Sequence, residues 1–170
     1  GVNDIFLKNI KCFAKKHKVD NLYTFVQNGS YKDEDVVDPR VFKAGFSLID
    51  SATLNSNLRL RDMKILAQQI NPLTGMQTKL SREHTHILPS AKIRYLSVAN
   101  TTNKPRALMT TGNITNGNYK LNTAQGRKAE SQHQYGFVYV EVVNNRVFKT
   151  YQVEALKNGN FHYEGEHYVN

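Results

Sequence analysis

Apolar residues near the start of the chain recur every three to four positions, with lysines between them. This spacing gives a helix one apolar stripe, and lysines in the last turn complement the negative end of the helix dipole. The pattern predicts an amphipathic helix over residues 4–17. A short β-rich run, Leu22–Val26, follows after Asp20 and Asn21, which gives a helix-to-strand unit of the α/β kind.

Two runs of apolar and β-branched residues near the end of the chain, Phe137–Val143 and Val147–Val153, flank Asn144 and Asn145. Asparagine tolerates the positive φ values of a tight turn, so this arrangement predicts an antiparallel hairpin. A second turn, at Asn158-Gly159, leads into a further extended segment that continues to Val169.

The middle of the chain gives weaker signals. Ile93–Val98 and Arg106–Thr111 are typical of strands, separated by a turn-rich linker. Leu58–Ile70 fits both a strand and a helix, and Val36–Asp50 contains only short core-like segments. We therefore predict one α/β or α+β domain over residues 1–170, with a mixed sheet, an N-terminal amphipathic helix and a C-terminal antiparallel hairpin.

Composition places the chain among globular proteins, since 170 residues with 39% apolar and 22% charged positions can bury a sizeable core. The single cysteine, Cys12, excludes an intramolecular disulfide and any multi-cysteine metal centre. No apolar run is long enough to span a membrane, and the first residues do not form a secretory signal. We expect a soluble, cytoplasmic protein with no membrane partner.

The net charge of +9 is concentrated in one part of the sequence. Between Arg59 and Lys128 there are twelve basic residues against only Asp62 and Glu83, so this stretch carries +10. Such an excess indicates a face that meets polyphosphate, although a linear concentration also fits a plain solvated surface. The candidates for nucleic-acid binding are Arg59, Arg61, Lys92, Arg94, Arg106, Lys120, Arg127 and Lys128.

The segment Thr110–Gly126 is rich in Thr, Asn and Gly, which suits a phosphate-contacting loop as well as a solvent-facing one. It lacks the Lys-Ser/Thr pair that a nucleotide-cradling loop requires. A third, less favoured interpretation makes Thr110, Thr111 and His133 the catalytic residues of a separate enzymatic site.

His84 and His86 have the spacing that places two imidazoles on one side of an extended segment, as metal ligands require. Two ligands do not make a metal site, and the sequence does not reveal a third. We therefore favour surface or core histidines and expect no cofactor in this chain. HExxH, GxSxG and CxxC patterns are also absent from the sequence.

Five short blocks, in order along roughly residues 5–165, resemble phage-encoded metallophosphoesterase-type nucleases. This family includes relatives of a pre-early phage DNase that degrades host DNA. The blocks are Leu54–Leu58, Ile70–Gly75, Pro89-Ser90-x-Lys92, Lys104-Pro105-x-Ala107–Gly112 and His133-x2-Gly136-x3-Val140–Val142.

The resemblance implies the region that precedes the phosphoesterase motifs Gly-Asp-x-His and Gly-Asn-His, neither of which is present here. The nearest approach, Gly159-Asn160-Phe161-His162, has one residue too many. The chain would then be a fragment of a larger protein, inactive alone, in an infected bacterial host. It would bind DNA phosphates and position a downstream centre that uses Mn²⁺ or Mg²⁺. The alternative is a non-enzymatic interaction or oligomerisation domain of a phage protein.

Overall fold

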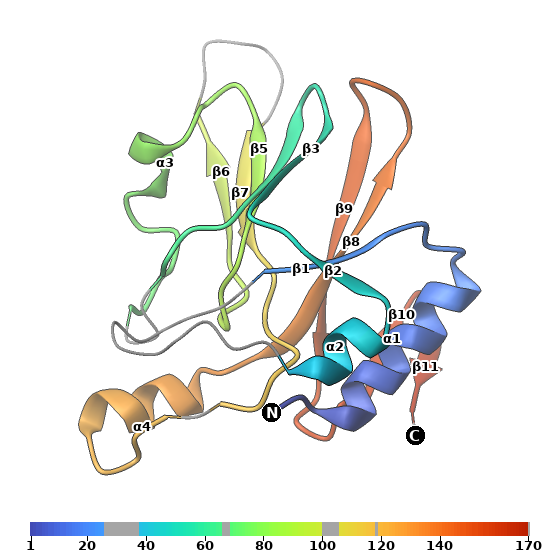
Figure 1. Ribbon diagram of the computed structural model, residues 1–170. Helices are drawn as coiled ribbons and strands as arrows, with labels where there is room; N and C mark the ends of the chain where they lie inside the picture. The colour runs from blue at the N-terminus through green and yellow to red at the C-terminus, as the bar shows by residue number, and fades with distance from the viewer. Residues whose placement is uncertain (26–37, 66–68, 100–105, 118, 170) are drawn as a thin grey trace.

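The computed structural model describes residues 1–25, 38–65, 69–99, 106–117 and 119–169. Short helices separate groups of successive strands along the chain (Figure 1). In order they are α1 (Asp4–Lys16), β1 (Leu22–Thr24), α2 (Pro39–Lys43), β2 (Phe46–Leu48), β3 (Ser51–Asn55), β4 (Leu58–Arg61), α3 (Met76–Lys79), β5 (Thr85–Leu88), β6 (Tyr95–Val98), β7 (Arg106–Thr110), α4 (Ala124–Ser131), β8 (Tyr135–Val142), β9 (Phe148–Ala155), β10 (Phe161–Tyr163) and β11 (Glu166–Tyr168). None of the described helices is long and apolar enough to cross a membrane.

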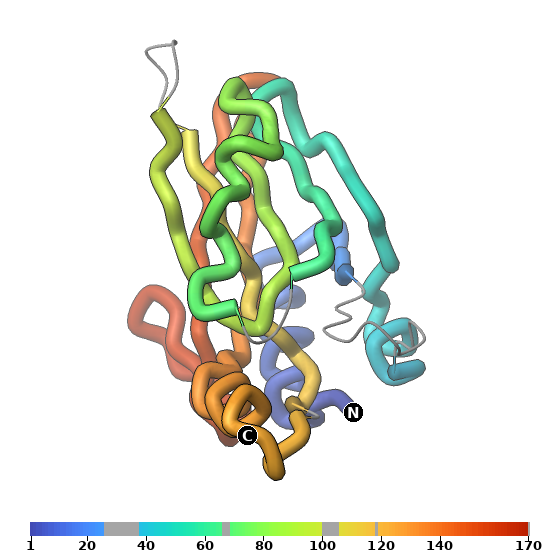
Figure 2. The backbone as a smooth tube through the Cα atoms, turned by 90° about the vertical axis from the view of Figure 1, so that its left-hand side faces the viewer, coloured from blue at the N-terminus to red at the C-terminus, as the bar shows by residue number. Residues whose placement is uncertain are grey.

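The largest sheet has five strands in the order β3-β4-β5-β7-β6. Its central strands β4, β5 and β7 are parallel, whereas β3 and β6 pair with them in antiparallel fashion at the two edges. Parallel strands are usually covered on both faces, and here α3 and the segment before it cover one face of β5, β7 and β6. Figure 2 shows the β8–β9 hairpin, in orange, running behind this sheet. The predicted mixed sheet is confirmed.

The β8–β9 hairpin is shared by two parts of the hydrophobic core. Successive side chains of a strand point to opposite faces. Val138 and Val140 pack on the five-stranded sheet, whereas Phe137 and Tyr139 pack against α1. The cluster between hairpin and sheet contains Leu58, Leu60, Ile87, Ala107 and Met109. The cluster on the other side contains Phe6, Ile10, Phe13, Val153, Ala155, Phe161 and Tyr168.

Helix α1 is fixed at its N-terminal end and along one face. The side chain of Asn3 caps the first turn by accepting a hydrogen bond from the Phe6 amide at 3.1 Å. The buried side-chain amide of Asn9 donates to the Gly159 carbonyl at 2.9 Å, which holds the helix against the turn before β10. The ring of Phe13 then packs at the centre of the aromatic cluster on β8, β10 and β11.

Several predicted elements are confirmed. The helix over residues 4–17 is α1, the two middle strands contain β6 and β7, and the hairpin is β8–β9. The extended segment after Asn158-Gly159 is a short hairpin, β10–β11. The ambiguous Leu58–Ile70 begins with strand β4, because Leu58 and Leu60 are buried between exposed arginines.

Other parts of the chain were not predicted from the pattern or lie outside the described residues. Val36–Asp50 contains α2 and β2, with Val36 itself outside the described residues. The linker before β7 and the end of the run Leu22–Val26 lie outside them as well. Helix α4 was missed, since it begins inside the Thr/Asn/Gly-rich segment, where the Thr123 hydroxyl accepts from the Gly126 amide at 3.0 Å.

Replacing Phe13 by Ala should lower the free energy of unfolding by about 3–5 kcal/mol, because it empties the centre of a packed aromatic cluster. The Phe13 ring centroid lies 5.1–5.2 Å from those of Tyr163, Phe137 and Tyr139. Urea denaturation of the variant measures the loss. Lys15→Ala on the exposed side of the same helix is the control, with an expected change within about 0.5 kcal/mol. Equal losses in the two variants would contradict this packing.

Candidate nucleic-acid interface

Strand β4 presents two arginines to solvent on the face turned away from the hairpin. Leu58 and Leu60 are buried under β8, so the intervening Arg59 and Arg61 must project from the opposite face. Both arginines are exposed, and no salt bridge joins either of them to a carboxylate in the described parts of the chain. Two adjacent guanidinium groups without an ionic partner are available for an external anion.

The neighbouring strand β3 adds two hydroxyl groups to this face. Ser51 lies opposite Arg61 and Thr53 lies opposite Arg59 in the antiparallel register, and both hydroxyl residues are exposed. Directly opposed residues share one face of a sheet. We call these four residues the β3–β4 strip. At the end of the strip, the Asp62 amide donates to the Asp50 carbonyl at 2.6 Å, so acidic residues follow immediately.

His84 and His86 lie beside the strip at the start of β5. His86 is paired with Arg59 in the parallel register, and its ring centroid lies 6.1 Å from that of His84. The His84 ring nitrogen Nδ1 is 3.1 Å from the Ser81 hydroxyl. His86 is 1% exposed, and its Nδ1 has no hydrogen-bond partner among the described residues. The two imidazoles therefore lie together on the basic side of the sheet.

The environment of these histidines keeps both of them neutral at pH 7. The pKa of His86 is lowered to about 4, chiefly by burial. Electrostatic interaction of the protonated ring with His84 and the two strip arginines contributes to this lowering. The pKa of His84 is lowered by burial and by the charge of Arg59. Because arginines surround the pair, the site repels cations. His84 and His86 are thus poorly placed to hold a metal, and no cluster of three ligating residues exists in the described part of the chain.

Two of the sequence candidates, Lys92 and Arg106, have structural contacts instead of a solvent-facing charge. Lys92 is 4% exposed, and its ammonium group donates to the Gln69 carbonyl. Arg106 is 8% exposed; its Nε donates to the Glu83 carbonyl at 2.7 Å and its Nη2 to Asn57 Oδ1 at 3.0 Å. Long basic side chains can bury their stems inside a fold when the charged head finds such acceptors. Lys92 and Arg106 therefore do not present exposed charges to a phosphate, contrary to the prediction from the sequence.

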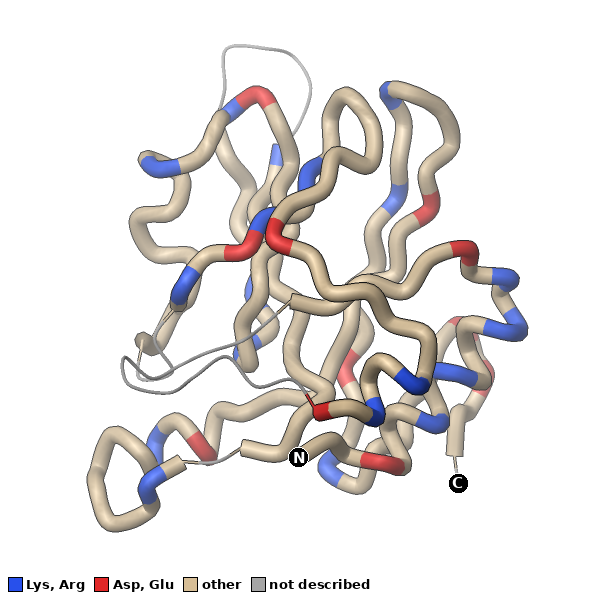
Figure 3. Tube along the Cα trace, in the orientation of Figure 1, with Lys and Arg blue, Asp and Glu red and all other residues tan. Residues whose placement is uncertain are grey.

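The remaining candidates lie apart from the strip. Lys120, Arg127 and Lys128 are exposed on or next to α4, which lies below the sheet in Figures 1 and 2. The half-buried Arg94 donates to Gln134 at 3.3 Å, and its charge, with that of Lys128, adds to the burial that lowers the Lys92 pKa. Figure 3 shows basic positions over many elements. The basic stretch of sequence is therefore divided between the strip and the α4 end.

The Thr/Asn/Gly-rich segment owes its small residues to close packing at its two ends. Gly112 is buried with φ +76°, and a Cβ there would lie 2.9 Å from the backbone of Gly136 on β8. A Cβ on Gly126 would overlap the Lys120 carbonyl. These two glycines thus permit two close backbone approaches, and no bound phosphate is needed to account for them.

Thr110, Thr111 and His133 do not form a nucleophile and base. Thr110 is completely buried; its hydroxyl donates to the Lys92 carbonyl at 2.5 Å and accepts from the Arg94 amide at 2.7 Å. The Thr111 hydroxyl donates to the Gly112 carbonyl at 2.8 Å. A catalytic hydroxyl must be able to reach both its base and a substrate, and the hydrogen bonds of Thr110 hold it in the core.

His133 instead holds a loop in place. Its Nε2 lies 2.8 Å from the Thr115 carbonyl, so that nitrogen carries the proton, and Nδ1 then accepts from the Tyr119 hydroxyl at 2.7 Å. Burial lowers the pKa of His133 and raises that of Tyr119 to about 12, which preserves this pattern of neutral groups. The three residues connect the chain after β7 to the start of β8.

Comparisons with protein-family models, with curated proteins and with solved structures each return no match for this chain. The site is therefore interpreted from its own residues.

Replacing Arg106 by Ala should lower the free energy of unfolding by about 1–3 kcal/mol, because the Glu83 carbonyl and the Asn57 amide lose a charged donor. Thermal or urea denaturation measures this. The matched control is Arg127→Ala on exposed α4, where the expected change stays within about 0.5 kcal/mol. A stable Arg106→Ala protein would show that the guanidinium is replaceable.

Acid should destabilise the protein through His86. Its pKa is about 4 in the folded state and near 6.5 when unfolded, so only the unfolded chain binds this proton in between. The stabilisation is complete above pH 6.5 and is lost as the pH falls towards 4, by at most about 1.4 kcal/mol per pH unit. Denaturation at several pH values should show a shallower decline in His86→Leu. Parallel profiles of wild type and variant would contradict this.

Proposed function

We propose that this protein binds the phosphate backbone of nucleic acid, and of DNA in particular, through the β3–β4 strip. The observation that carries the proposal is the pair of exposed arginines, Arg59 and Arg61, which have no carboxylate partner in the described residues. Alternate residues of a strand are about 6.5–7 Å apart. That spacing is close to the separation of successive phosphates along a strand of DNA, so each arginine can meet its own phosphate.

The surroundings of the arginines support an anionic ligand. Ser51 and Thr53 offer hydroxyl donors opposite them, and hydroxyls, like arginines, are frequent phosphate contacts. His84 and His86 are neutral, so the positive charge beside the strip comes from its arginines. A guanidinium binds a phosphate through two parallel hydrogen bonds, and release of condensed counterions adds affinity that does not depend on sequence. The ligand class we propose is therefore a polyphosphate chain.

The resemblance to phage metallophosphoesterase-type nucleases gives this binding a purpose. In that family a centre that uses Mn²⁺ or Mg²⁺ cuts the DNA, and a basic region beside it would hold the substrate. Two metal ions clamp the attacking and leaving oxygens, so the substrate must be held in register with them. Thr110 and His133 serve the fold, so we propose grip and positioning as the contribution of this chain.

The test is the salt dependence of duplex DNA binding by wild type, Arg59→Gln and Arg61→Gln. Each variant should bind more weakly, and the slope of log K against log salt should become shallower by about 0.9 for each phosphate that is no longer neutralised. Fluorescence anisotropy at several salt concentrations measures both quantities. Changing the DNA sequence should have little effect, since binding to the phosphate backbone carries no sequence information.

Lys15→Gln is the control, because it removes one positive charge from an exposed position on α1. This helix lies on the far side of the hairpin from the sheet. It should leave the slope unchanged. If Lys15→Gln and Arg59→Gln act equally, net charge sets the affinity and the strip is not a site. A further variant, Arg127→Gln, reports whether the α4 end takes part in the same complex.

A further inference from the structure

The outer edge of β8 has backbone groups that none of the described strands uses. The Val143 amide donates to the Val147 carbonyl at 3.0 Å, so the odd-numbered residues of β8 bond to β9. The even-numbered residues then point their N–H and C=O groups away from β9. Among the described residues no hydrogen bond reaches those of Val138, Val140 or Val142.

The first part of this edge already accepts a parallel neighbour. The Asn113 amide donates to the Gln134 carbonyl at 3.0 Å, and the Gly136 amide donates to the Asn113 carbonyl at 3.2 Å. The chain then turns away from β8, since Ile114 and Thr115 pair with residues around Val2. Among the described residues, no strand pairs with Val138–Val142, where a third strand would continue the same ladder.

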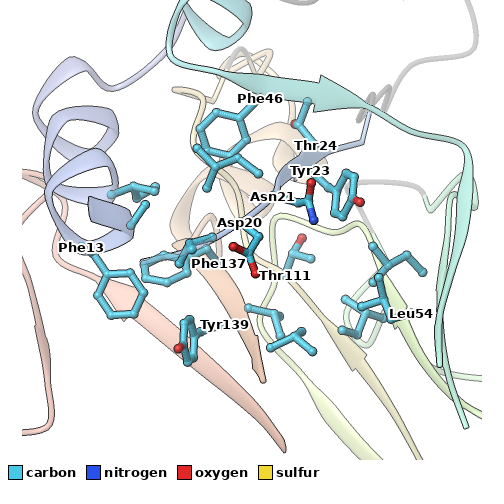
Figure 4. A pocket seen from close by; sticks show the side chains of 18 of the residues that line it. Phe13, Asp20, Asn21, Tyr23, Thr24, Phe46, Leu54, Thr111, Phe137 and Tyr139 are labelled. Carbon is cyan, nitrogen blue, oxygen red and sulfur yellow. The ribbon is translucent and has the colours of Figure 1, made fainter. Parts of the chain in front are cut away.

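A cleft of about 680 Å³ runs along this open edge. All residues from Gly136 to Val142 line it, so the strand meets the cleft with its backbone edge as well as its side chains. Figure 4 shows Phe13, Phe137 and Tyr139 on one side of the cleft, Leu54 on the other, and Asp20, Asn21 and Tyr23 of the segment around β1 between them. Its volume lies within the range of roughly 300–1,000 Å³ that encloses a short ligand.

The walls of the cleft match the two faces of an added strand. On the α1 side an incoming side chain would meet aromatic rings, and on the sheet side it would meet Leu54, Leu60 and Ile87. Successive side chains of a strand point to these two sides in turn. From Val138 to Val142 the open ladder spans roughly 17 Å, the length of about five extended residues.

We propose that this cleft binds an extended peptide, which adds a third strand to the β8–β9 hairpin. The recognised chemistry is a row of peptide N–H and C=O groups together with apolar side chains at alternate positions. A second copy of the protein is a poorer occupant, because its own β8 edge is recessed between the same walls. The two proposals can be tested separately, since Arg59 and Arg61 lie on the other face of the five-stranded sheet and, of the strip residues, Thr53 alone also lines the cleft.

The experiment uses a pool of synthetic capped octapeptides with Val, Ile, Tyr or Phe at alternate positions. Peptides retained by the immobilised protein are identified by mass spectrometry, and the best binder is titrated into the free protein. We expect at least one retained peptide, and we expect it to slow hydrogen exchange at the amides of Val138, Val140 and Val142. The odd-numbered amides of β8, already bonded to β9, should change less.

Val140→Pro should weaken peptide binding by roughly tenfold or more, because it removes an outward N–H that no described residue uses. Proline is tolerated in an edge strand at such a position, and circular dichroism checks the fold. The matched control is Thr150→Pro. Thr150 is the register partner of Val140, and its own N–H points to the opposite edge of the hairpin, so binding should persist.

Three results would overturn the proposal. The first is the retention of no peptide by the folded wild-type protein. The second is binding that leaves the exchange of all three outward amides unchanged, a measurement that does not depend on any variant. The third is a wild-type dimer in sedimentation that Val140→Pro converts to a monomer, which would assign the edge to a second copy of the chain.

Discussion

The structure depends on the two-sided burial of β8. Val138 and Val140 of this strand pack against the five-stranded sheet, and Phe137 and Tyr139 pack against the α1 cluster. Because the side-chain period of a strand is two, a slip of one residue would exchange valines for aromatic rings on both sides at once. Gly136 extends the same constraint, since it lets β8 pass close to the end of β7 at Gly112. The register of one hairpin therefore fixes how the sheet and the helix are placed relative to each other.

The same alternation determines which charges reach solvent. On β4 it sends Leu58 and Leu60 into the core and leaves Arg59 and Arg61 outside, whereas on the fully buried β7 it encloses Arg106. The buried guanidinium of Arg106 is tolerated because a backbone carbonyl and a side-chain amide oxygen accept hydrogen bonds from it. The sum of charges along the chain could not separate these cases. The distinction depends on whether other segments of the chain pack over the side chain, as they do at Arg106 and do not at Arg59.

Local patterns were sufficient where an element is defined by its own residues. Helix α1 and the β8–β9 hairpin follow from periodicity and an Asn-Asn turn, and both are confirmed. The central strand β5 gave no such signal, because its pairing with β4 and β7 is parallel and brings together segments distant in sequence. The arginine pair could be named from the sequence, but its relation to Ser51, Thr53 and His86 is a property of the sheet register.

Strand β4 separates the two surfaces proposed here. Leu60 lines the cleft, and its neighbours Arg59 and Arg61 face the opposite side of the sheet. Of the four strip residues Thr53 alone also lines the cleft, so a bound peptide would leave both arginines accessible to a phosphate chain. Coupling between them would pass through Thr53 and the backbones of β3 and β4, because packed sheets transmit small displacements whereas the charges on the two sides are screened within about 10 Å. The two proposals together would place a phosphate chain against the arginines on one face of the sheet and an extended peptide in the cleft on the other side.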